Sequence, residues 1–266
     1  MKLPIHQIDA FTSELFRGNP AAVVLLEEWL PDALLQAIAM ENNLSETAFV
    51  RPQGEAFGLR WFTPRVEVDL CGHATLASAF VLFEEGLVAA ERVRFETSSG
   101  ALTVEREGAL LLLDFPARPP RPSRRAPSAG TIEAALGARP QDVLIARDLL
   151  VIHDDEEQIR GLRPDFARIA ALDAFAVIAS APGREADFVS RFFAPRAGVP
   201  EDPVTGSAHC TLVPYWSERL GKSKLRALQL SERGGELFLE DRGDRVTIAG
   251  RATPYLRGEI GLDGTS

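Results

Sequence analysis

The chain has 266 residues, of which 45% are hydrophobic and 25% charged, and its formal net charge is −9. This is the composition of an ordinary globular protein, and its acidic balance argues against nucleic acid or an anionic membrane as a partner. Two cysteines exclude a disulfide-rich secreted domain. Asp9 and Glu14 stand where a signal peptide needs an apolar core, and no apolar run approaches the about 20 residues of a membrane span. We therefore expect a cytoplasmic protein.

The first 115 residues read as strands interrupted by two helices. Alternating or β-branched runs predict strands at 3–11, 21–26, 45–52, 58–64 and within 92–115. A turn, Gly18-Asn19-Pro20, precedes the second of these strands. Helical spacing behind a proline predicts a helix over Pro31–Asn43. A second helix, Gly72–Gly86, is mostly apolar, so we expect it to be buried on nearly all sides.

The stretch PARPPRPSRRAPSAG (Pro116–Gly130) holds five prolines and four arginines, which is typical of a linker. The predicted domains are therefore an N-terminal lobe of residues 1–115, a linker of residues 116–130, and a C-terminal lobe of residues 131–266. In one alternative, the last strand of the chain completes the N-terminal lobe.

The C-terminal part has its own order of elements. Helices are predicted at 131–137, 163–172 and 206–221, and strands at 149–154, 174–180, 187–195 and within 225–252. Pro214 lies inside the last helix, so we expect it to kink or divide that helix.

Two segments repeat across the linker in the same order. RWFTPR, which begins at Arg60, matches RFFAPR, which begins at Arg191, at four of six positions and an offset of 131. GALTVEREG, from Gly100, matches GELFLEDRG, from Gly235, at four of nine positions and an offset of 135. A repeated order of this kind predicts two homologous lobes. We expect an α+β fold with pseudo-twofold symmetry, in which each lobe wraps a β-barrel-like twisted sheet around a central helix, with a cleft between the lobes.

The ungapped alignment places Cys71 over Asp202, and each precedes the buried helix of its lobe. A helix N-terminus has unpaired N–H groups and partial positive charge, so it can hold a carboxylate. Gly72 and Gly206 allow close backbone approach, and Ser207 adds a hydroxyl. The alternative is ordinary helix capping, for which Asp202 and Ser207 are suitable residue types.

Glu46 leads into an apolar run, and His73 lies in the first turn of the first buried helix. If the Glu46 carboxylate projects into a buried cleft, burial raises its pKa toward the range of a general base. Glu46, His73 and Asp202 would then form an acid–base set. The sequence contains no metal-ligand spacing, no Walker loop and no GxGxxG motif, so neither a metal nor a cofactor is predicted.

Four segments together resemble the phenazine-biosynthesis PhzF-type isomerases, which have the diaminopimelate-epimerase-like fold: DAFTSELFRGNPAAVV, NNLSETAFV, CGHATLASA and EDPVTGSAH, in order from Asp9 to His209. The resemblance implies a cofactor-independent proton shift and a homodimer. It implies Glu46 as the acid/base, with His73, Asp202 and Ser207 lining the site. It also carries over Asn19 as a substrate contact.

The sequence departs from one pattern of this fold, in which racemases and epimerases use one cysteine from each lobe. Cys71 stands at the first position, but the alignment puts Asp202 at the second. Cys210 lies eight residues further on, about two helical turns away, and cannot replace it. Cys71 is thus a vestige, a small buried hydrophobe or an auxiliary thiol.

The leading hypothesis is an isomerase that holds a small anionic metabolite and shifts a proton on it through Glu46. One alternative is a racemase or epimerase that uses Cys71 with Asp202 or Glu46. Another is a binding protein without catalysis. The sequence predicts neither the substrate nor a role in phenazine synthesis.

Overall fold

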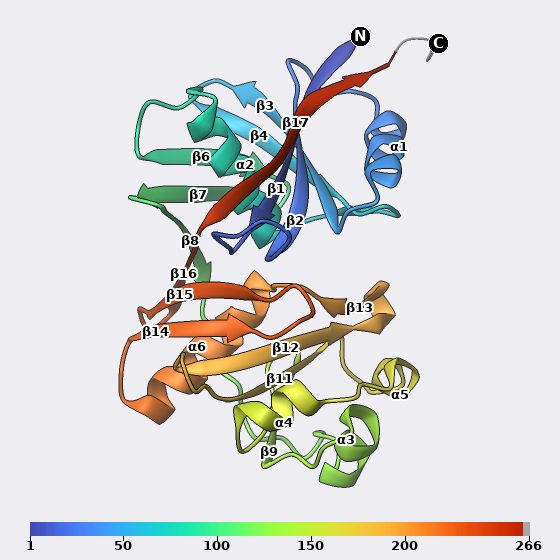
Figure 1. The fold of residues 1–266 in the computed structure, drawn as a ribbon, viewed down its shortest axis with the longest axis vertical. Coiled ribbons are helices and arrows are strands. Elements are labelled where there is room, and N and C mark those ends of the chain that lie inside the picture. The colour runs from blue at the N-terminus through green and yellow to red at the C-terminus, as the bar shows by residue number, and fades with distance from the viewer. Residues whose placement is uncertain (263–266) are drawn as a thin grey trace. The chain divides into compact units, whose positions relative to one another are not determined.

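A computed structural model of the protein describes residues 1–262, and the chain forms two compact units (Figure 1). The first unit comprises Met1–Asp114 and the C-terminal residues from Ala249 onward, and the second comprises Phe115–Ile248. None of the helices in residues 1–262 is both long and apolar enough to cross a membrane.

The first unit contains two helices and a continuous ladder of strands. The ladder runs β17–β1–β2–β3–β4–β6–β7–β8, with the short β5 paired to β4. Its elements are β1 (Lys2–Ala10), β2 (Asn19–Leu25), α1 (Asp32–Asn42), β3 (Glu46–Gln53), β4 (Ala56–Phe62), β5 (Glu67–Val68), α2 (Gly72–Glu84), β6 (Arg92–Thr97), β7 (Gly100–Glu107), β8 (Leu110–Pro116) and β17 (Ala252–Gly261).

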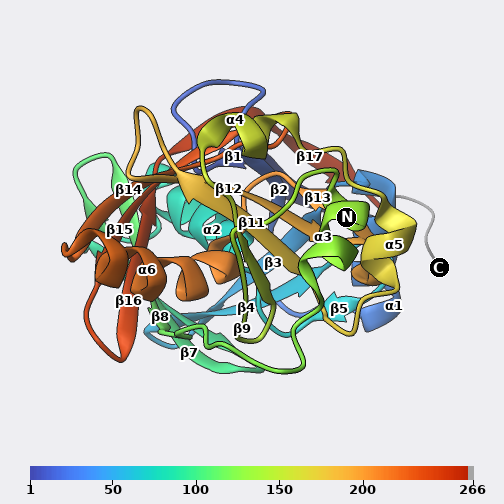
Figure 2. The same ribbon diagram turned by 90° about the horizontal axis from the view of Figure 1, so that it is seen from below.

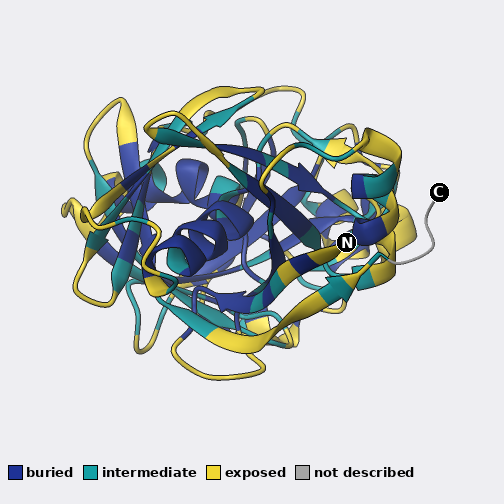
Figure 3. Cartoon of the chain, turned by 90° about the horizontal axis from the view of Figure 1, so that it is seen from above, coloured by how far each residue is buried: buried dark blue, intermediate teal, exposed yellow. Residues whose placement is uncertain are grey.

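Helix α2 is the centre of the first unit. It contacts β1, β2, β3, β7 and β17, and ten of its residues are buried, including Leu76 and Leu82, which are fully enclosed. The expected burial of this helix on nearly all sides is confirmed, and buried helices appear dark blue in Figure 3. Helix α1 lies outside the ladder and packs Leu35 and Ile38 against Phe49 and Phe62.

The second unit is built in a similar way around α6 (Figure 2). Its ladder runs β9–β10–β11–β12–β14–β15, with β13 paired to β12. Its elements are α3 (Ala129–Leu136), β9 (Asp142–Ile145), β10 (Leu149–Ile152), α4 (Glu156–Gly161), α5 (Phe166–Ala170), β11 (Val177–Pro182), β12 (Phe188–Ala194), the 3₁₀ turn η1 (Pro195–Ala197), β13 (Val199–Asp202), α6 (Gly206–Leu220), β14 (Lys224–Gln229), β15 (Gly235–Asp241) and β16 (Arg245–Gly250).

Trp216 anchors α6 in its unit. Its indole stacks on Phe188 of β12 with ring centroids 5.6 Å apart, and its N–H donates to Ser180 of β11 at 2.9 Å. Pro214 lies inside α6, but the helix runs unbroken from Gly206 to Leu220, so the expected division there does not occur. The backbone of the Pro/Arg-rich stretch is tied to the second unit, because the N–H of Arg118 donates to the Cys210 carbonyl at 2.8 Å.

Both units pair their strands in the same sequence of directions. In the first, the pairs β2–β3, β3–β4, β4–β5, β4–β6 and β6–β7 are parallel, antiparallel, antiparallel, parallel and antiparallel. In the second, β10–β11, β11–β12, β12–β13, β12–β14 and β14–β15 follow the same order. The central helix follows β5 in one unit and β13 in the other, so the repeat in the sequence corresponds to a repeated topology.

The arginine that begins each RxFxPR segment has the same function in its own unit. Arg60 binds both carboxylate oxygens of Glu67 at 2.7 and 2.6 Å, and its guanidinium lies 5.1 Å from the ring centroid of Phe62. Arg191 binds both oxygens of Glu201 at 2.7 and 2.8 Å and lies 5.1 Å from the ring of Phe193. Two parallel hydrogen bonds between a guanidinium and a carboxylate hold the two groups in one plane. Each arginine therefore ties a central strand to the short strand before the helix.

The second unit has three additional residues between its arginine and its helix. Glu67 follows Arg60 by seven positions, whereas Glu201 follows Arg191 by ten. Helix α2 begins at Gly72 and α6 at Gly206, 134 positions later. The helix starts therefore pair Cys71 with Thr205, and the ungapped alignment that placed Cys71 over Asp202 is wrong at this point. The additional length falls where η1 interrupts the register of β12 with β13.

Candidate active site

Glu46, Cys71 and His73 meet in the first unit although they come from two separate segments. Glu46 is the first residue of β3, which pairs in parallel with β2. Cys71 is the N-cap residue of α2, and His73 lies in the first turn of that helix. The Cys71 side chain makes no capping hydrogen bond, so its sulfur is available to the cluster. One ligand-type atom from each residue lies within 4.8 Å of the others.

A short contact joins Glu46 and His73 in the cluster. The Glu46 Oε2 atom lies 3.0 Å from His73 Nε2, and the two side chains are 16% and 7% exposed. Cys71 Sγ lies 3.5 Å from His73 Nδ1 and 3.9 Å from Nε2. Burial limits competition from water, so this carboxylate–imidazole contact is stronger than an exposed pair of the same length.

Asn19 holds the other side of the His73 ring. It is the first residue of β2, is fully buried, and places Nδ2 3.3 Å from His73 Nδ1. A neutral His73 with its ring hydrogen on Nε2 can accept from this amide at Nδ1. In the charged ring both nitrogens donate, so Nε2–H faces Glu46 and the Asn19 amide turns to present Oδ1 to Nδ1. The structure therefore brings Asn19 together with the predicted pair.

The two members of the pair stabilise each other's charge. Burial alone raises the pKa of Glu46, but the neighbouring His73 outweighs it by charge and hydrogen bonding, and the pKa lies below its usual value. Burial lowers the pKa of His73, whereas Cys71 and Glu46 raise it, and the pKa ends well above its usual value. We expected burial to raise the pKa of Glu46; the expectation fails because it did not include the adjacent imidazole.

The Cys71 side chain is a protonated thiol and not a reactive thiolate. Burial, reinforced by the Glu46 carboxylate, raises the pKa of its thiol to about 11. A thiol with that pKa is protonated at neutral pH, and the thiolate is the nucleophilic and basic form. Cys71 can therefore donate a proton to a neighbour, but it is poorly suited to take one from carbon.

Asp202, Gly206 and Ser207 lie in the second unit, around the start of α6. Asp202 ends β13, and Thr205, not Asp202, is the N-cap residue of α6. The Thr205 hydroxyl donates to Asp202 Oδ2. The carboxylate is therefore held by the cap residue, while Gly206 and Ser207 form the first turn of the helix.

Gln229 of β14, which was not among the predicted site residues, holds this segment in place. Its amide nitrogen donates to the Asp202 carbonyl at 2.8 Å and to Thr205 Oγ1 at 3.1 Å, and its Oε1 accepts from the Thr205 N–H at 2.9 Å. Gln229 is fully buried. A glutamine within a strand has no local signature, whereas Thr205 before a glycine at a helix start is a recognisable N-cap signal.

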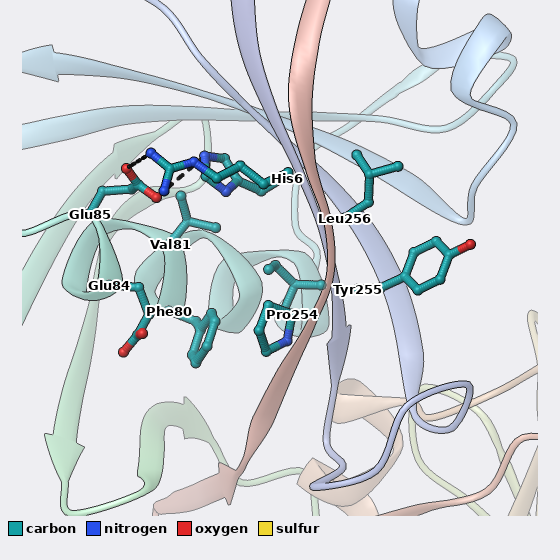
Figure 4. Close-up of a pocket in the computed structure, with 10 residues that line it drawn as sticks. His6, Phe80, Val81, Glu84, Glu85, Pro254, Tyr255 and Leu256 are labelled. Carbon is teal, nitrogen blue, oxygen red and sulfur yellow. Dashed lines mark hydrogen bonds and ion pairs between the residues drawn. The ribbon is translucent and has the colours of Figure 1, made fainter.

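A separate hollow lies in the first unit between the last turns of α2 and β17 (Figure 4). The Glu85 carboxylate lies 2.7 Å from Arg257 and 3.9 Å from His6 across it. Phe80 and Pro254 also line it. None of the predicted site residues lines this hollow.

The comparisons with known proteins place the chain in one family. The sequence pattern of the family described as "Phenazine biosynthesis-like protein" matches residues 8–258. An uncharacterized isomerase of Pseudomonas aeruginosa is 56% identical over 98% of this chain and 100% of its own length. A crystal structure of a PhzF-family phenazine biosynthesis protein from Enterococcus faecalis is 48% identical, with a TM-score of 0.96 over 98% of this chain and 100% of that one.

A more distant structure supports the fold alone. A protein of Pseudomonas aeruginosa described as a predicted epimerase is 20% identical, with a TM-score of 0.74 over 97% of this chain and 99% of that one. The expected α+β, epimerase-like fold is therefore confirmed. The predicted class of enzyme, a PhzF-like isomerase, is confirmed by the family match and by relatives that are named isomerases. The chain belongs to the phenazine biosynthesis-like (PhzC-PhzF) protein family.

Proposed function

We propose that this protein is a cofactor-independent isomerase that moves a proton on a small carboxylate-bearing metabolite, with Glu46 as the acid/base. The observation that carries the proposal is the buried contact of 3.0 Å between Glu46 Oε2 and His73 Nε2. His73 keeps Glu46 ionised at neutral pH, because it holds the pKa of that carboxyl below its usual value. An ionised carboxylate in a site with little water can take a proton from a carbon acid.

The proposed reaction has two proton transfers at one residue. Glu46 removes a proton from carbon, and the resulting carboxylic acid returns it to another carbon of the same substrate. His73 stabilises the negative charge that develops between the two transfers, and the N-terminus of α2 adds its partial positive charge. Asn19 orients the imidazole and is the proposed substrate contact next to it.

Cys71 serves as an auxiliary group in this proposal. Because the pKa of its thiol is raised to about 11, a racemase mechanism that begins with a Cys71 thiolate is disfavoured. In the second unit, Asp202 is proposed as a further acid/base group, and Gly206 and Ser207 as contacts for the substrate carboxylate. We also propose a cytoplasmic location and a homodimer as the working form. Light scattering of the purified protein tests the homodimer.

The proposal is tested by hydrogen exchange with solvent. The protein is incubated in D₂O with small carboxylates whose C–H bonds are acidified by a carbonyl group or double bond, and mass spectrometry detects deuterium. We expect wild type to label and isomerise at least one compound and E46Q to lose both activities. The matched control is E41Q, which changes an exposed glutamate of α1. Exchange that persists in E46Q contradicts the proposal, and tight binding of a compound without exchange supports the non-catalytic alternative.

A further inference from the structure

We propose that the Glu46–Cys71–His73 cluster binds Zn²⁺ as a three-ligand site. The bound ion occupies the Glu46 carboxylate, so that Glu46 can no longer act as the acid/base and turnover stops. The cluster supplies one carboxylate oxygen, one thiol sulfur and one imidazole nitrogen within 4.8 Å of one another. These are the three ligand types that proteins use for Zn²⁺, and sites with three protein ligands leave the fourth position open.

Two of the distances in the cluster are close to those of a zinc site. At tetrahedral angles, a nitrogen and an oxygen bound to the same Zn²⁺ lie about 3.4 Å apart, and a nitrogen and a sulfur about 3.6 Å. Between His73 Nε2 and Glu46 Oε2 the distance is 3.0 Å, and between Nε2 and Cys71 Sγ it is 3.9 Å. These two separations are within roughly half an ångström of those that coordination requires. Cys71 Sγ also lies 3.5 Å from His73 Nδ1, so the thiol has to rotate about its Cα–Cβ bond, away from the side of the ring and toward an ion on Nε2.

The backbone positions of the three ligands are also fixed before any ion arrives. Cys71 and His73 are fixed two residues apart by the first turn of α2, and Glu46 is fixed by the parallel pairing of β3 with β2. All three residues are buried or nearly so. Asn19 meets the opposite ring nitrogen of His73 at 3.3 Å, which is where a metal-bound histidine needs a partner. With Nε2 on the metal, Nδ1 carries the hydrogen, and the Asn19 amide turns to present Oδ1.

The charges of the ligands also favour a divalent cation. The Cys71 thiolate and the Glu46 carboxylate together neutralise Zn²⁺, which offsets the unfavourable partial charge of the α2 N-terminus. Coordination releases the thiol proton and any proton on His73 to water. No metal-ligand spacing is visible in the sequence because Glu46 lies 25 positions before Cys71.

Binding of the ion and loss of turnover are separate claims. The binding claim depends only on the geometry of the cluster. The loss of turnover rests on the proposed function, because it follows only if Glu46 is the acid/base. The experiment therefore reads binding without any substrate, so that either claim can fail by itself.

The test titrates the untagged full chain with Co²⁺, a spectroscopic substitute for Zn²⁺, and then adds Zn²⁺. We expect a near-ultraviolet thiolate-to-cobalt charge-transfer band that saturates at one Co²⁺ per chain and disappears when Zn²⁺ is added. The matched control is C210S, because Cys210 is the only other cysteine of the sequence and lies buried in α6. We expect C210S to keep the band and C71S to lose it.

Competition with a fluorescent zinc chelator measures affinity in the same proteins. We expect C71S to bind Zn²⁺ about 100-fold more weakly than wild type and E46Q at least about 10-fold more weakly, with circular dichroism confirming that both variants are folded. The proposal is overturned if wild type shows no charge-transfer band, if C71S retains the band, or if Zn²⁺ affinity is unchanged in both C71S and E46Q.

Discussion

Glu46 Oε2 and His73 Nε2 lie 3.0 Å apart, with Glu46 at the start of a strand and His73 in the first turn of the central helix. The contact is largely closed to solvent, and it moves the pKa values of the two groups in opposite directions. Both groups are thereby kept charged near neutral pH. The pair thus combines an ionised base with a positive neighbour, and the predictions below follow from that arrangement or from the packing around α6.

The substitution H73Q should move the acid limb of the pH–rate profile to higher pH. The acid limb reports protonation of Glu46. Burial raises the pKa of Glu46, and His73 lowers it by charge and hydrogen bonding. Without the imidazolium, burial is unopposed and the pKa rises. Steady-state rates between pH 4 and 9 check this, with H6Q as a control in another buried histidine. A limb that stays in place or moves to lower pH in H73Q is inconsistent with the pairing.

The substitution C71S should lower turnover by less than about tenfold, whereas E46Q should abolish it. The pKa of the Cys71 thiol is raised to about 11, so the group is protonated in the working range and a hydroxyl can replace its weak hydrogen bonding. The rate of C71S is compared with that of C210S, which alters the other buried cysteine. A loss in C71S as large as that in E46Q would instead support the racemase alternative.

The substitution Q229L should destabilise the second unit by about 3 kcal/mol, because it removes a buried side chain that makes three hydrogen bonds. Those bonds join Gln229 to the Asp202 carbonyl and to the backbone and hydroxyl of Thr205. Urea unfolding measures the change, and Q141L at an exposed glutamine provides the comparison. If the two variants unfold at the same urea concentration, Gln229 does not hold the start of α6.

His209 should make the protein less stable as the pH falls. Burial lowers the pKa of His209 from 6.5 to about 4, while its Nδ1–H donates to the Thr205 carbonyl at 2.8 Å. The unfolded chain therefore binds a proton first, and stability is lost as the pH falls from about 6.5 to about 4. Between pH 7 and 5 this loss is about 2 kcal/mol.

The variant H209Q should lack that part of the pH dependence. Urea unfolding of wild type and H209Q at pH 7 and pH 5 gives the difference directly, and equal m-values show that both unfold from comparable states. Equal losses of stability in the two proteins would mean that His209 is already protonated, or is solvated, in the folded state.

The repeat was the most informative feature of the sequence, because it involved residues that are fixed by geometry. Arg60 and Arg191 each bind a glutamate with both oxygens and lie 5.1 Å from the aromatic ring of the same strand. Because both units need an arginine and an aromatic residue that make these contacts, the arginine and the phenylalanine are identical in the two segments. The glutamates do not align without a gap, because η1 adds length before Glu201, and an ungapped comparison cannot detect an insertion.

The candidate site could be predicted only in part. Glu46 and His73 stand in recognisable segments, but their contact depends on the pairing of β3 with β2 around α2. The direction of the Glu46 pKa was expected from burial alone, and it reversed once the neighbouring imidazole was known. Gln229 could not be found, because its two partner residues lie 24 and 27 positions away in the chain.

The most direct test of the central claim follows a deuterium label through one turnover. A substrate found by the exchange screen is deuterated at the carbon that loses its proton and mixed with excess enzyme in H₂O. A single acid/base group that removes and returns the proton predicts that a measurable share of deuterium appears at the new position of the product, in wild type and E41Q but not in E46Q. Complete loss of the label, with inversion at the original carbon, would contradict a proton shift through Glu46.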